Sequence, residues 1–81
     1  MEQKVNILKK LLNNKIFLDN FPLIRYVHVN QYGMNNIDVV FSFTDGFVYN
    51  DYEDFREEAR SLVYNLAKYA GIGSRLITIY P

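Results

Sequence analysis

The chain has 81 residues, of which 49% are hydrophobic and 16% are aromatic, and it contains no cysteine. This length accommodates one domain, and the apolar composition with few Gly and Pro residues excludes a disordered chain. The absence of cysteine excludes disulfides, thiolate zinc sites and cysteine nucleophiles. Nine Lys and Arg residues balance nine Asp and Glu residues, so the chain as a whole has no electrostatic attraction to nucleic acid.

The start of the chain lacks the apolar stretch of a signal peptide, and no run of residues approaches the length of a membrane span. Small secreted domains are usually stabilised by disulfides, which this chain cannot form. We therefore expect a cytoplasmic protein that does not act at a membrane. Its high content of Asn, Lys, Ile and Tyr is typical of proteins encoded by low-GC microbes or their phages.

The first predicted element is a helix over residues 2–13. Its apolar side chains recur at helical spacing, with lysines on the other side: Val5, Ile7, Leu8, Leu11 and Leu12. Asn13 and Asn14 are predicted to end it, because Asn tolerates the left-handed conformation. Residues 16–18 form either a last helical turn or an irregular segment under the core, and residues 19–22 have the composition of a turn.

Two alternating segments, residues 23–31 and 37–44, predict a β-hairpin around a loop rich in Gly and Asn. The side chains assigned to the core face are Leu23, Val27, Val29, Ile37, Val39, Phe41 and Phe43, with Ile24 on the other face. A shift of the pairing by one residue would expose half of these side chains to water. Two registers of the hairpin avoid this exposure. One has a five-residue loop over 32–36, and the other a three-residue loop over 34–36 that places His28 opposite Ser42 and Arg25 opposite Asp45.

The next segment, residues 47–49, is predicted as a short third strand or an extended stretch, with a loop into the following helix as the alternative. A helix over residues 51–70 has the clearest signals in the chain. Asp51 is the expected N-cap, and further acidic residues stand at the positive end of the helix dipole. An apolar stripe continues to residue 70, where Gly71 and Ile72 fit a Schellman ending.

A final strand is predicted over residues 75–80 and is closed by Pro81, with Ile77 and Ile79 facing the core and Leu76, Thr78 and Tyr80 facing away. The order is then α-β-β-(β)-α-β. We expect one α+β domain over residues 1–81, in which a small antiparallel or mixed sheet of three or four strands carries two helices on one face. If the last strand lies beside residues 23–31, the arrangement resembles a split β-α-β fold of ferredoxin-like type without its first strand, which implies no function.

No catalytic, cofactor or metal site is indicated. His28 is the only histidine, and its pairing with Ser42 in one register lacks an orienting acid. The glycines of residues 71–74 follow a helix C-terminus, whose carbonyl groups repel anions, so they indicate a helix stop and not a phosphate loop. We therefore expect that the chain is not an enzyme.

The outward face of the sheet is the main candidate for a function, since exposed tyrosines offer a large contact area at low entropic cost. An ordinary solvent-facing sheet is the alternative interpretation. The acidic start of the second long helix is a second candidate patch, or else a solvated helix face. The predicted partner-binding residues are Tyr26, His28, Tyr32, Thr78 and Tyr80 on the sheet, with Asp51, Glu53, Asp54 and Glu57 on the helix.

We predict a non-enzymatic protein-interaction module, of the adaptor or inhibitor type, that binds a protein partner or a second copy of itself. The alternative is a small RNA- or DNA-binding domain that uses Tyr26, Tyr32 and Tyr80 together with Lys4, Lys9 and Lys10. Charge favours the protein partner, because a single-strand binder needs several cations near its aromatic residues. A third hypothesis is an accessory subunit of an enzyme complex.

Overall fold

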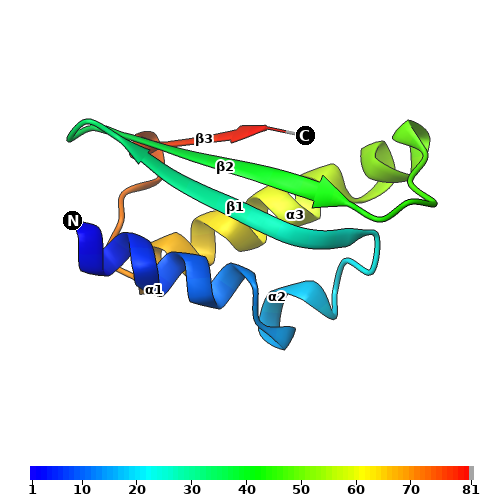
Figure 1. The fold of residues 1–81 in the computed structure, drawn as a ribbon, viewed down its shortest axis with the longest axis horizontal. Coiled ribbons are helices and arrows are strands. Elements are labelled where there is room, and N and C mark those ends of the chain that lie inside the picture. Colours follow the sequence, from blue (N-terminus) through cyan, green and yellow to red (C-terminus); the bar gives the residue numbers. More distant parts are fainter. Residues whose placement is uncertain (81) are drawn as a thin grey trace.

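The computed structural model describes residues 1–80, apart from the side chain of Tyr49. A three-stranded sheet carries the helices on one of its faces, which confirms the predicted α+β class (Figure 1). In chain order the elements are α1 (Glu2–Leu12), α2 (Lys15–Leu18), β1 (Ile24–Tyr32), β2 (Asn36–Phe43), α3 (Tyr49–Tyr69), the 3-10 helix η1 (Ser74–Leu76) and β3 (Ile77–Tyr80). None of the helices within residues 1–80 is long and apolar enough to cross a membrane.

The strand order is β1-β2-β3, with β1 and β2 antiparallel and β2 and β3 parallel. Parallel neighbours need a crossover connection, and α3 provides it between β2 and β3. The last strand therefore lies beside β2 and not beside β1, so the ferredoxin-like arrangement is not formed. β1 and β3 are the two edges of the sheet.

The hairpin adopts the register of the five-residue-loop alternative, with Gln31 opposite Ile37. The alternative that placed His28 opposite Ser42 is wrong, because Val40 lies opposite His28. The predicted parity is confirmed, since the alternating apolar residues of both strands share the inner face of the sheet.

β1 contains a bulge at Arg25. Ile24 lies opposite Phe43 before the bulge, and regular pairing begins at Tyr26 after it. The extra residue reverses the alternation, so Ile24 is 3% exposed while Leu23 is only half-buried. The predicted faces of these two residues are wrong for this reason. Arg25 nevertheless approaches Asp45, with 3.9 Å between Nη1 and Oδ1, but both side chains are exposed and the ion pair contributes little.

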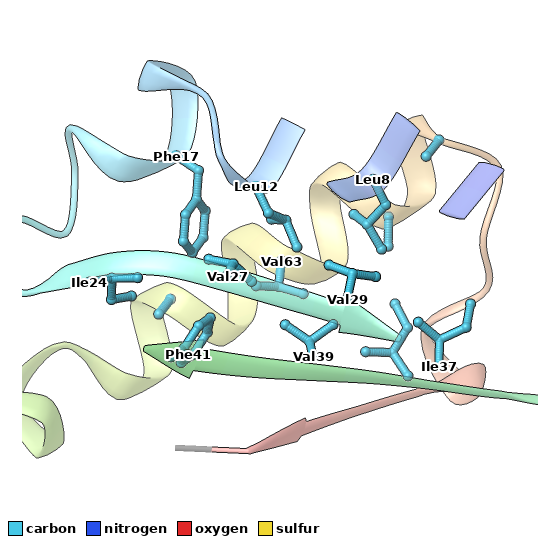
Figure 2. Close-up of a cluster of buried hydrophobic side chains, with 14 of the residues drawn as sticks. Leu8, Leu12, Phe17, Ile24, Val27, Val29, Ile37, Val39, Phe41 and Val63 are labelled. Atoms are coloured by element: carbon cyan, nitrogen blue, oxygen red, sulfur yellow. The ribbon is translucent and has the colours of Figure 1, made fainter. Parts of the chain in front are cut away.

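The core lies between the inner face of the sheet and the helices. Figure 2 labels the side chains that converge there: Leu8, Leu12, Phe17, Ile24, Val27, Val29, Ile37, Val39, Phe41 and Val63. Each of them is at most 5% exposed, as expected for a chain that has a single core to stabilise it.

The junction of α1 and α2 contains no left-handed residue, because Asn13 has a φ of −109°. Its side-chain amide instead donates hydrogen bonds to the carbonyl oxygens of Lys9 (2.9 Å) and Val27 (2.8 Å). The amide oxygen of Asn13 also accepts a hydrogen bond from the Val27 N–H at 2.8 Å. Asn14 then begins α2 by accepting a hydrogen bond from the Ile16 N–H, so the undecided segment is a separate short helix.

α3 begins two residues earlier than predicted, at Tyr49, and its N-cap is Val48, which makes no side-chain capping bond. Asp51 lies inside the first turn and is not the N-cap. Residues 47 and 48 form no strand, so the predicted short third strand is wrong and the chain passes directly into the helix.

An aromatic cluster accounts for this start. Phe43 stacks on Phe47 with 4.0 Å between ring centroids, and Tyr52, which is 3% exposed, contacts Phe43 and Phe55 edge-on at 5.2 and 5.5 Å. A side-chain cap contributes about 1 kcal/mol. Each aromatic pair adds about 0.5–1.5 kcal/mol beyond the area it buries. Several such pairs outweigh one cap, so the packing of Tyr52 determines where the helix begins.

The end of α3 confirms the predicted Schellman motif. Gly71 has a φ of 83°, and its N–H donates to the Lys68 carbonyl oxygen at 3.0 Å. The Ile72 N–H donates to the Ala67 carbonyl oxygen at 2.8 Å, and the Ile72 side chain is buried. A residue with a side chain would be strained at this φ, which is why glycine ends the helix.

The final segment differs from the prediction in its first residues, since residues 74–76 form η1 and Leu76 is half-buried against the core. β3 itself confirms the predicted faces. Ile77 is buried, Ile79 is half-buried, and Thr78 and Tyr80 are exposed on the other side. Pro81, predicted to close the strand, lies outside the described residues.

Candidate functional site

The face of the sheet opposite the helices is uncovered within residues 1–80 (Figure 1). Strand pairing arranges two rows of side chains across it, one of Asn30, Asp38 and Thr78 and the other of His28, Val40 and Tyr80. Tyr26 and Tyr32 extend this surface along β1. We call these eight residues the open face. The structure thus brings together all five sheet residues that were predicted as partner-binding.

Three tyrosines give the open face its aromatic surface. Tyr26 is 38% exposed, Tyr32 is 58% exposed and Tyr80 is 44% exposed, so much of each ring is accessible. Tyr26 also packs edge-on against His28, with 4.8 Å between ring centroids and 63° between the ring planes. The predicted outward orientation of these side chains is confirmed.

Asp38 lies at the centre of the open face, between Asn30 on β1 and Thr78 on β3. Its side chain is half-buried, and its Oδ1 atom is buried without a hydrogen-bond partner among the described residues. An unsatisfied buried acceptor costs about 1–3 kcal/mol. The oxygen is shielded from solvent in this conformation, so a donor from a bound molecule would reach it only after the Asp38 side chain rotates.

The acidic start of α3 is a separate region. Its four predicted site residues, Asp51, Glu53, Asp54 and Glu57, are all exposed. Glu53 pairs with Arg56 of the same helix, with 3.4 Å between Oε1 and Nη1. These acids lie in the helical layer, so the structure does not join them to the open face (Figure 1). Of the four, Asp51 lies in the first turn of α3, where the helix dipole favours an acidic side chain.

A groove of about 350 Å³ lies between α1 and β1, lined by Asn6, Lys9, Lys10, Asn13 and Tyr26. We call it the α1–β1 groove. Asn6 and Asn13 each lie three or four positions from both Lys9 and Lys10, so the four residues share one side of the helix. Sequence reasoning missed this site, because nothing local to either segment indicates the Asn13–Val27 hydrogen bonds that bring the lysines next to Tyr26.

Within residues 1–80, no group of three His, Asp or Glu side chains is placed to hold a metal ion. Ser42 lies opposite Tyr26 and His28 lies opposite Val40, so the two residues do not form the directly opposed pair that one register predicted.

Comparisons of the chain with protein-family models, with curated proteins and with solved structures found no match.

Proposed function

We propose that the chain is a non-enzymatic protein-interaction module that binds a partner protein through the open face. The observation that carries this proposal is the set of three exposed tyrosines on the open face, which surround the half-buried Asp38. Tyrosine is enriched in protein interfaces because it offers area with few rotatable bonds. Asp38 adds a negative charge to this surface, which favours a partner with Lys or Arg side chains opposite it.

The same carboxylate argues against a nucleic-acid strand on the open face. Proteins that bind single strands combine aromatic residues with a positive groove that follows the phosphates. On the open face, His28 is the one side chain that can become cationic, and Asp38 would repel a phosphate group. A partner surface with cationic or neutral donors fits this pattern better.

Capture of a partner from the native cells, followed by calorimetry with the purified partner, tests the proposal. We expect Tyr80→Ser and Asp38→Asn to weaken binding strongly, because each removes a contact from the open face. Tyr69→Ser is the matched control, since Tyr69 is 86% exposed on α3 and lies outside the open face. The proposal fails if both open-face variants bind the partner as tightly as the unmodified chain.

The nucleic-acid alternative, with Tyr26, Tyr32 and Tyr80 beside Lys4, Lys9 and Lys10, makes a different prediction. Fluorescence anisotropy of labelled single-stranded RNA and DNA, at low and physiological salt, measures it directly. We expect no binding at physiological salt. Saturable binding that is lost in Tyr80→Ser would show that the open face binds a nucleic acid and not a protein.

A further inference from the structure

The α1–β1 groove is a concave site that the proposed function does not use. It shares only Tyr26 with the open face, and its other lining residues belong to α1 and its C-cap. Its volume of about 350 Å³ lies at the lower end of the range for ligand sites, about 300–1,000 Å³. This is enough space for one or two side chains of a bound peptide.

Asn13 determines how a ligand can be held there. Both of its amide hydrogens are used, one by the Lys9 carbonyl and one by the Val27 carbonyl, and its oxygen accepts the Val27 N–H. The main chain of Val27 at the edge of β1 is therefore already satisfied and cannot pair with an added strand. A ligand must be held by the side chains of Asn6, Lys9, Lys10 and Tyr26.

The charge of the groove comes from Lys9 and Lys10. Both side chains are exposed, and neither forms an ion pair with another residue in the range 1–80. The residues three or four positions away along the chain are all uncharged: Val5, Asn6, Ile7, Leu12, Asn13 and Asn14. Both lysines line the same groove, so an anion bound there would be attracted by two positive charges.

The remaining groups indicate which anion fits. Lysine is a compact charge that binds a single carboxylate without bidentate geometry. Tyr26 offers part of an aromatic ring beside the ammonium groups, and Asn6 offers an amide for a peptide backbone. The groove holds two lysines, which match two carboxylates of a short peptide segment, whereas single-strand binders follow the phosphates with a longer row of cations.

We propose that the α1–β1 groove binds an acidic peptide segment of a protein partner. Lys9 and Lys10 hold its carboxylates, Asn6 bonds its backbone, and Tyr26 packs against it. The attraction is sensitive to salt, because both lysines are exposed. Of the open face, binding uses Tyr26 alone, since Asp38 and Tyr80 do not line the groove.

Fluorescence anisotropy of a labelled hexaglutamate peptide tests this site. We expect saturable binding at low salt that weakens at physiological salt. The double variant Lys9→Gln/Lys10→Gln should lower the affinity about tenfold. The matched control Lys15→Gln/Lys68→Gln removes the same charge from exposed lysines outside the groove and should change it by less than about twofold. Asp38→Asn and Tyr80→Ser should retain binding, which separates this proposal from that for the open face.

A titration followed by nuclear magnetic resonance needs no variant. Hexaglutamate should shift the amide signals of Asn6, Lys9, Lys10 and Tyr26 more than those of β3. No binding at low salt, or equal losses in the two double variants, would overturn the proposal. The proposal would also be overturned if labelled oligothymidylate bound more tightly than hexaglutamate and Lys9→Gln/Lys10→Gln abolished that binding. The groove would then be a phosphate-binding site.

A second copy of the chain is the other acidic partner to be distinguished. Its candidate segment is the start of α3, where Glu53 and Asp54 are exposed. Light scattering should show no self-association that depends on these residues. The proposal would be overturned if the chain formed a dimer that dissociates in both Lys9→Gln/Lys10→Gln and Glu53→Gln/Asp54→Gln. The groove would then bind the second copy of the chain.

Discussion

The two faces of the sheet differ along one strand, β2, where successive residues alternate between them. Val39 and Phe41 point into the core and are 0% and 3% exposed, whereas Asp38 and Val40 are half-buried on the open face. A side chain on the inner face has neighbours from both the sheet and the helices, so its size and shape determine stability. A side chain on the open face has neighbours only within the sheet. Its chemical type can therefore suit a binding partner, and substituting it has little effect on folding.

The largest effect is expected on the inner face, for Phe41→Ala. The ring packs against Phe17 at 6.1 Å and Tyr52 at 6.3 Å between centroids, and its removal leaves a cavity. We expect the free energy of unfolding to fall by about 3–5 kcal/mol. Urea denaturation measures it. A loss near 1 kcal/mol would mean that the core collapses around the missing ring.

The neighbouring pair Val39 and Val40 compares the two faces with the same substitution. Val39→Ala should lower the free energy of unfolding by about 2 kcal/mol, from the transfer of two carbon atoms and the cavity they leave. Val40→Ala should cost about half of that or less, because Val40 is only half-buried. Thermal and urea unfolding of both variants give the comparison. Equal losses would show that the open face contributes to the core.

Asn13 bonds to the main chain at the edge of β1, and Asn13→Ala tests this contact between α1 and the sheet. The substitution removes the hydrogen bonds to both main-chain groups of Val27 and to the Lys9 carbonyl. We expect a loss of about 1–2 kcal/mol, because water replaces part of these bonds. Faster hydrogen exchange of the Val27 amide should accompany it. Unchanged exchange at Val27 would show that the helix–strand contact does not depend on this side chain.

The smallest effect is expected for Tyr80→Ser on the open face. Tyr80 is 44% exposed on an edge strand, so the free energy of unfolding should change by about 0.5 kcal/mol or less. Urea denaturation of Tyr26→Ser extends the test to β1, the other edge strand of the sheet. A loss above about 2 kcal/mol would show that these tyrosines are structural, and the open face would no longer be a separate binding surface.

The features predicted correctly from the sequence are those that local chemistry determines. Alternation placed Val27, Val39 and Phe41 on one face, because the β-strand period is fixed by the backbone. Gly71 and Ile72 ended α3 as predicted, because the Schellman motif needs only a left-handed residue and a following apolar one.

The features that were missed depend on distant residues. The start of α3 was placed at Asp51 because capping is a local signal, while the packing of Tyr52 against Phe43 is not. The bulge at Arg25 and the position of β3 beside β2 are set by packing across the sheet. For the same reason, the face of Asp38 could be predicted but its buried, unpaired oxygen could not.

The parallel pairing of β3 with β2 has a consequence for the binding equilibrium. β3 has four residues, and its pairing closes the long chain segment that contains α3. Such contacts form late and open first, because the chain loses entropy before they stabilise it. Thr78 and Tyr80 belong to this strand, so the open face is complete only when β3 is docked. A partner that contacts Tyr80 selects the docked state, and hydrogen exchange of the β3 amides should slow as that partner is added.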